Sequence, residues 1–161
     1  MFGIGESDND AINILKRDHR EVEALFKDYE EQKDDGKSAA KTKLARLICE
    51  ALTVHAAIEE ELFYPAARRA LEDDSKELVD EAAVEHQSLK DIIGRLEQAP
   101  VSDPLYDAGV KVLSEYVKHH VKEEENELFP KVRSLKLDLE GLGQTMLARK
   151  GELEDRKRKA G

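Results

Sequence analysis

Four histidines and two glutamates lie on apolar stripes that repeat at helical spacing in this sequence. They are His19, His55, Glu59, His86, His120 and Glu124. His55 and His120 each have a glutamate four residues later, and an α-helix places residues i and i+4 on one face, about one turn apart. Imidazoles and carboxylates in a dry core are costly unless they are paired or bind a metal ion. The pattern therefore predicts a buried metal site.

The ligand types indicate which metals this site would take. Imidazole and carboxylate ligands without a thiolate suit iron or manganese and tolerate zinc. Glu59 and Glu124 can each bridge two ions, so a dinuclear site is more natural than a mononuclear one. The alternative is a purely structural polar core, because a single histidine on an apolar face usually only hydrogen-bonds its neighbours. Four inward-facing histidines from four different segments favour the metal site.

Four amphipathic segments have to position these residues. Apolar residues recur in steps of three and four along residues 12–29, 44–66, 79–96 and 109–128, and nothing alternates with the period of two that a strand requires. Residues typical of helix starts precede the four segments: Ser7 or Asp8, Ser38, Asp74 with Glu77, and Asp103 with Pro104. Pro65 and Pro130 lie where a proline can bend or stop a helix. The sequence predicts an all-α fold.

An internal repeat indicates how the four helices are arranged. His19 and His86 are 67 residues apart, and His55 and His120, each at the start of a similar motif that ends in proline, are 65 residues apart. Two similar αα-hairpins predict an antiparallel up-down-up-down four-helix bundle over residues 8–135. A C-terminal polar helix with a basic tail is expected at 136–161. At 1.5 Å rise per residue, all four histidines fall near the middle of the bundle.

These motifs resemble the bacterial hemerythrin family, of the HHE cation-binding type, over about residues 10–135. The resemblance implies a non-haem di-iron centre in a four-helix bundle, with two iron ions as the cofactor. His19 and His55 would hold one iron and His86 and His120 the other. Glu59 and Glu124 would bridge the two ions.

The sequence departs from the oxygen-carrying hemerythrins at two positions. In those proteins the third helix has a second histidine one turn before the position of His86, whereas this sequence has Ala82. Their last bridging residue is an aspartate five residues after its histidine, whereas here it is Glu124, four residues after His120. A missing ligand would leave one iron more open, so reversible dioxygen carriage does not follow from the resemblance.

Other residues have alternative interpretations. His119, with Glu123 four residues later, is a second candidate for the ligand assigned to His120. Tyr116 lies one turn before His120 and is expected in the core, where it could hydrogen-bond a glutamate or fill the gap at Ala82. Cys49 is expected to be a small core residue. The basic end at 156–159 is expected to be solvated, and the glutamates beside the motifs, at 60, 123 and 125, to be exposed neighbours of little importance.

The amino-acid composition argues against some classes of partner and location. A net charge of −10 with 161 residues argues against nucleic acid as a partner, and 39% charged residues against a membrane span. One cysteine and the absence of a signal peptide suggest the cytoplasm. We expect a di-iron protein that binds a small ligand, dioxygen or nitric oxide, for sensing, storage or protection. The alternatives are a di-iron enzyme that decomposes peroxide or reduces nitric oxide, and an iron-handling module.

Overall fold

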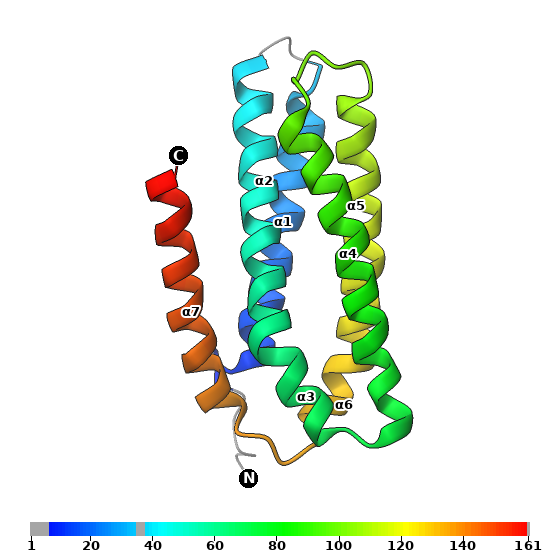
Figure 1. Ribbon diagram of the computed structural model, residues 1–161, viewed down its shortest axis with the longest axis vertical. Helices are drawn as coiled ribbons and strands as arrows, with labels where there is room; N and C mark the ends of the chain where they lie inside the picture. Colours follow the sequence, from blue (N-terminus) through cyan, green and yellow to red (C-terminus); the bar gives the residue numbers. More distant parts are fainter. Residues whose placement is uncertain (1–6, 35–37, 161) are drawn as a thin grey trace.

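A computed structural model describes residues 7–34 and 38–160, and in these ranges the chain is helical without strands, as the sequence predicts (Figure 1). No helix within these ranges is both long and apolar enough to cross a membrane. The elements are α1 (Ala11–Gln32), α2 (Ser38–Ile58), the π-helical turn η1 (Glu59–Phe63), α3 (Tyr64–Ala70), the 3-10 turn η2 (Asp73–Ser75), α4 (Lys76–Gln98), α5 (Tyr106–Glu123), the π-helical turn η3 (Glu124–Leu128), α6 (Phe129–Arg133) and α7 (Leu139–Ala160).

Four long helical rods form the bundle, and two of them are composite. Helix α2 continues through η1 into α3, and α5 continues through η3 into α6 (Figure 1). Helix α1 begins one residue after Asp10, whose side chain accepts a hydrogen bond from the backbone N–H of Asn13 at 2.9 Å. Asp10 is therefore the N-cap, and the expectation of Ser7 or Asp8 in this role is wrong.

Each composite rod contains a π-helical turn that starts at a glutamate of the predicted site. The backbone N–H of Tyr64 donates to the carbonyl of Glu59, five residues back, and that of Phe129 donates to Glu124 in the same way. A proline follows immediately in both cases, and a proline ring clashes with the carbonyl four residues before it in a regular α-helix. The wider turn accommodates that ring. Because this turn holds one extra residue, the residues that face inward after each glutamate come one position later in the sequence than in a regular α-helix.

Two apolar cores lie along the bundle, one on each side of the buried histidines. The lower core is built around Ile12, Ile58, Phe63, Phe129 and Met146. The upper core is built around Val22, Leu52, Leu89, Leu113 and Val117. Cys49 is buried in the upper core, as expected for a small apolar side chain. The polar residues of the predicted site therefore lie between two dry layers.

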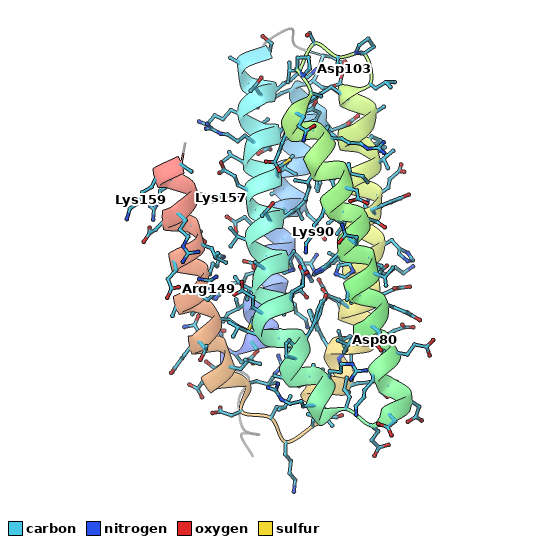
Figure 2. The ribbon with its side chains drawn as sticks, in the orientation of Figure 1. Asp80, Lys90, Asp103, Arg149, Lys157 and Lys159 are labelled. Atoms are coloured by element: carbon cyan, nitrogen blue, oxygen red, sulfur yellow. The ribbon has the colours of Figure 1, made fainter. Side chains whose placement is uncertain are left out.

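Helix α7 packs along α1 and α2 on the outside of the bundle (Figure 1). Met146 is fully buried in the lower core, and Gly143 approaches the carbonyl of Asn9 so closely that a Cβ atom would lie 2.1 Å from it. Arg149 donates to Glu61 at 2.8 Å (Figure 2). The far end of α7, which carries Lys159, projects away from the bundle (Figure 2). Leu139 is buried in the lower core and Leu153 packs against it, so this helix is attached to the bundle at least from Leu139 to Leu153.

Candidate metal centre

The structure brings all six predicted site residues together at the middle of the bundle. None of the six side chains is more than 7% exposed. Ligand atoms of one group lie within 4.8 Å of one another: His19, His55, Glu59 and Glu124. A second group with the same spacing consists of Glu59, His86 and His120. Glu59 belongs to both groups, so the arrangement has the form of two adjoining sites with a shared carboxylate.

Several buried atoms at this point have no hydrogen-bond partner. They are Nε2 of His19, Nε2 of His55, both carboxylate oxygens of Glu59 and Oε1 of Glu124. Some of them approach closely, for example His55 Nε2 and Glu59 Oε1 at 2.6 Å, but without hydrogen-bond geometry. An unsatisfied buried polar atom costs about 1–3 kcal/mol. Five such atoms directed at one place fit a bound cation, so the donor set suits a metal ion.

The other ring nitrogen of each histidine faces a carboxylate from a neighbouring helix. The Nδ1-to-oxygen distances are 2.7 Å for His19 with Glu125, 2.9 Å for His55 with Asp18, 3.3 Å for His86 with Glu60 and 3.0 Å for His120 with Glu85. In each pair Nδ1–H donates to the carboxylate, which leaves Nε2 free to bind a metal. Glu60 and Glu125 are therefore partly buried partners of the histidines and not the exposed neighbours that the sequence predicted.

Three of these outer carboxylates are in turn paired with a cationic side chain. Arg20 pairs with Glu125, Lys150 with Asp18 at 2.7 Å, and Lys90 with Glu60 at 2.6 Å. The fourth, Glu85, faces Nε2 of His119 at 3.5 Å. Burial alone would raise the pKa of Asp18, but the hydrogen bonds from His55 and Lys150 lower it below its usual range. The pKa values of Glu85 and Glu125 are lowered as well, mainly by their hydrogen bonds to His120 and His19. These three carboxylates thus stay ionised and orient the imidazole rings.

Glu59 and Glu124, the carboxylates inside the cluster, raise the pKa values of the histidines beside them. Burial alone would lower the pKa of His55, but Glu59 and Asp18 raise it to about 10. Glu124 has the corresponding effect on His120 and raises its pKa to about 11. A metal ion at Nε2 would compete with a second proton on each of these rings, because only the neutral imidazole is a ligand.

Tyr64, and not Tyr116, contributes the hydroxyl group at this site. Its buried Oη donates to Glu124 Oε2 at 2.5 Å and lies 3.2 Å from Nε2 of His86. Burial and the charge of Glu124 raise the pKa of this phenol, which keeps it protonated. Tyr116, the tyrosine expected in the core, is instead 51% exposed. Ala82 and Tyr64 are both buried in the lower core.

The two halves of the site differ at one pair of equivalent positions. Phe129 occupies, in the second repeat, the position of Tyr64 in the first. Its ring stacks on His19 with the centroids 5.9 Å apart and offers no hydroxyl. The His86 and His120 half therefore has a proton donor that the His19 and His55 half lacks.

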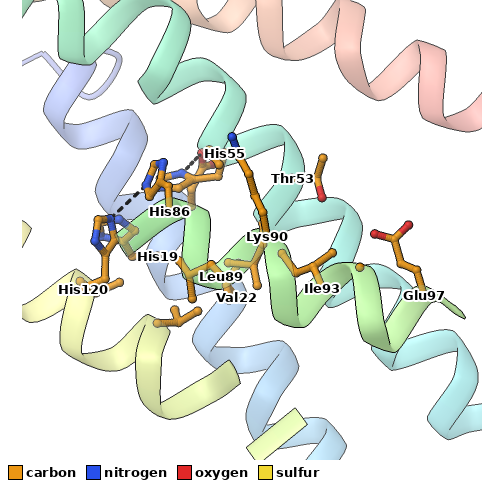
Figure 3. Close-up of a pocket in the computed structure, with 16 residues that line it drawn as sticks. His19, Val22, Thr53, His55, His86, Leu89, Lys90, Ile93, Glu97 and His120 are labelled. Atoms are coloured by element: carbon orange, nitrogen blue, oxygen red, sulfur yellow. Dashed lines mark hydrogen bonds and ion pairs between the residues drawn. The ribbon is translucent and has the colours of Figure 1, made fainter. Parts of the chain in front are cut away.

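His119 lies outside the buried set. Its side chain is 65% exposed, and Nε2 faces Glu123 at 3.2 Å and Glu85. His120 is the residue that points inward, so the buried cluster contains His120 and not His119. Figure 3 shows His19, His55, His86 and His120 converging at one end of a cavity in the bundle.

One protein family matches this chain in comparisons with known proteins. A family model described as the hemerythrin HHE cation binding domain matches residues 10–132. A DNA nickase from Nostoc sp. is 29% identical over 133 residues, which are 82% of this chain and 36% of that protein, so the chain spans about a third of that relative's length. The crystal structure of a hemerythrin HHE cation binding domain-containing protein from Mycobacterium kansasii is similar with a TM-score of 0.77 and 26% identity, covering 91% of this chain and 88% of that one.

Proposed function

This chain belongs to the hemerythrin HHE cation-binding family, and we propose that it is a non-haem di-iron protein that binds a small ligand such as dioxygen or nitric oxide. His19 and His55 would hold one iron, His86 and His120 the other, and Glu59 and Glu124 would bridge them. The observation that carries this proposal is the set of five buried, unpartnered ligand atoms directed at one place. Bound iron would supply redox chemistry and coordination positions for the ligand.

The protein's own residues would prepare this site in two ways. The outer carboxylates, such as Asp18 and Glu125, fix the rings so that Nε2 faces inward. Oη of Tyr64 lies 2.5 Å from Oε2 of Glu124 and beside His86. There the hydroxyl group can serve as a ligand or as a hydrogen-bond donor to a bound molecule. Because Phe129 lacks this hydroxyl, we propose that the small ligand binds on the side of Tyr64.

An enzyme is the second candidate, and Tyr64 is the observation that favours it. A buried donor beside the proposed open iron could deliver a proton during decomposition of peroxide or reduction of nitric oxide. Anaerobic loading with ferrous iron, followed by optical spectra on admitting oxygen, separates the candidates. Reversible charge-transfer bands support ligand binding. Irreversible oxidation with turnover of peroxide supports the enzyme, and irreversible oxidation without turnover supports iron handling.

We further propose an antiparallel up-down-up-down order for the bundle and a location in the cytoplasm. The tight packing of α1 on α2 and of α4 on α5 supports two helical hairpins. The single, buried Cys49 is compatible with a reducing compartment.

The name DNA nickase belongs to a relative of which this chain covers 36%. A net charge of −10 supports our expectation that DNA is not a partner, and an electrophoretic mobility assay with duplex DNA at low salt tests it.

A further inference from the structure

A cavity of about 240 Å³ lies among all four long helices, directly next to the four histidines (Figure 3). Its inner wall consists of aliphatic side chains that are at most 7% exposed: Val22, Leu52, Leu89, Ile93, Val117 and Val121. The lining residues that are partly or fully exposed, such as Thr53, Lys90 and Gly94, come from α2 and α4. The cavity therefore opens between these two helices and ends at the histidine rings.

Polar groups at the mouth are already satisfied within the protein. The hydroxyl of Thr53 donates to the carbonyl of Cys49 at 2.7 Å, so it offers no free donor to the cavity. The ammonium of Lys90 donates to Glu60 at 2.6 Å. Glu97 lies at the end far from the histidines (Figure 3). A positively charged molecule would thus lose its hydration inside the cavity without gaining a partner along the aliphatic wall.

We propose that this cavity is a binding site for an uncharged, apolar organic molecule of about the size of a benzene ring, held beside the proposed metal centre. A dry cavity of about 150 Å³ lined by aliphatic and aromatic side chains is already large enough to bind benzene or xenon. The volume here exceeds that and is far more than a diatomic gas needs. Binding at this site requires only the apolar wall, whereas its position in front of the metal rests on the proposed function.

Gly94 provides a way to fill the cavity without disturbing the fold. It lines the cavity near the C-terminal end of α4, four residues before the last residue of the helix, and a Cβ atom built on it meets no atom within 4 Å. Larger side chains at this position can extend into the empty space, and replacing glycine in a helix interior also favours the helix. Gly151 in α7 has equally open surroundings but does not line the cavity, so it is a matched control.

The test measures thermal unfolding of the purified, metal-bearing protein at pH 7 with benzene and with benzylammonium, which has the same ring but a positive charge that neither a metal ion nor a protonated histidine attracts. At about ten times the dissociation constant, benzene should raise the melting temperature by roughly 3–6 °C. Benzylammonium should not. The increase should shrink through the series Gly94→Ala, Gly94→Leu and Gly94→Phe and vanish at the last, whereas Gly151→Leu should keep the full increase.

Three results would overturn the inference: no effect of benzene on the unsubstituted protein, an equal effect of benzylammonium, or an undiminished effect of benzene in Gly94→Phe. If Gly94→Phe does not fold, Gly94→Leu decides, since it must reduce the increase relative to Gly151→Leu. Metal content is measured on the same samples. A protein that lacks metal but binds benzene contradicts the proposed function alone, and a metal-bearing protein that ignores benzene contradicts this inference alone.

Discussion

Removal of the outer carboxylate at His19 should weaken metal binding more than removal of its equivalent at His86. Glu125 accepts from His19 at 2.7 Å and is 18% exposed, whereas Glu60 accepts from His86 at 3.3 Å and is 32% exposed. Loss of such a partner typically lowers metal affinity about 10–100-fold. The shorter and better shielded bond belongs at the upper end of that range. We therefore expect Glu125→Ala to cost about 100-fold and Glu60→Ala about 10-fold, a difference of about 1.4 kcal/mol.

The assay is anaerobic competition for ferrous iron between the protein and a coloured chelator. Each variant should lose one of two irons at a lower chelator concentration, and the other iron should be retained as in the unsubstituted protein. Glu123→Ala is the control, because Glu123 pairs only with the exposed His119. The reasoning is refuted if Glu60→Ala weakens binding as much as Glu125→Ala, or if Glu123→Ala weakens it by a similar factor.

Three further predictions concern single side chains. Tyr64→Phe should keep the fold, since the repeat has phenylalanine at this position, but release iron about 10-fold faster, because Glu124 loses its 2.5 Å donor. Lys150→Met should lower stability by about 1–2 kcal/mol, or roughly 2–8 °C in thermal melts, because it leaves the buried Asp18 without its cation, whereas Lys157→Met should not. Cys49 should resist thiol reagents at pH 8, since burial raises its pKa to about 12 and leaves about one thiolate in ten thousand, and should react once urea unfolds the chain.

Each of these predictions has a result that contradicts it. Unchanged iron release from Tyr64→Phe would mean that the hydroxyl does not support Glu124. Equal melting temperatures for the Lys150→Met and Lys157→Met variants would mean that the ion pair to Asp18 contributes nothing measurable. Rapid labelling of Cys49 in the folded protein would mean that the upper core opens readily.

The sequence predicts the all-α fold and the six inward residues because both follow from helical spacing. Apolar steps of three and four define each helix, and the repeat selects His120 over His119, which the structure confirms by burial. That these residues bind metal stays a prediction. The start of α1 was placed wrongly, since several acidic and serine residues precede it and only the structure shows that Asp10 accepts from Asn13.

The inward position of Tyr64 could not be predicted from regular helical spacing. From Glu59 an α-helix returns to the same face at residues 62 and 63, whereas the π-helical turn brings residue 64 inward. The proline that follows, present in both repeats, is the signal that could have indicated this shift. The outer carboxylates could not be predicted for a different reason: Asp18 is next to His19 in sequence but serves His55 on another helix. Such pairings are tertiary and leave no local pattern.

The most direct test of a dinuclear metal centre is the number of iron ions per chain, measured by elemental analysis on protein purified from iron-replete cells. We expect close to two for the unsubstituted protein. His19→Ala and His120→Ala, which each remove one ligand from a different half, should each fall toward one. An unsubstituted protein without metal, or full iron content in both variants, would contradict the assignment of these buried residues as ligands.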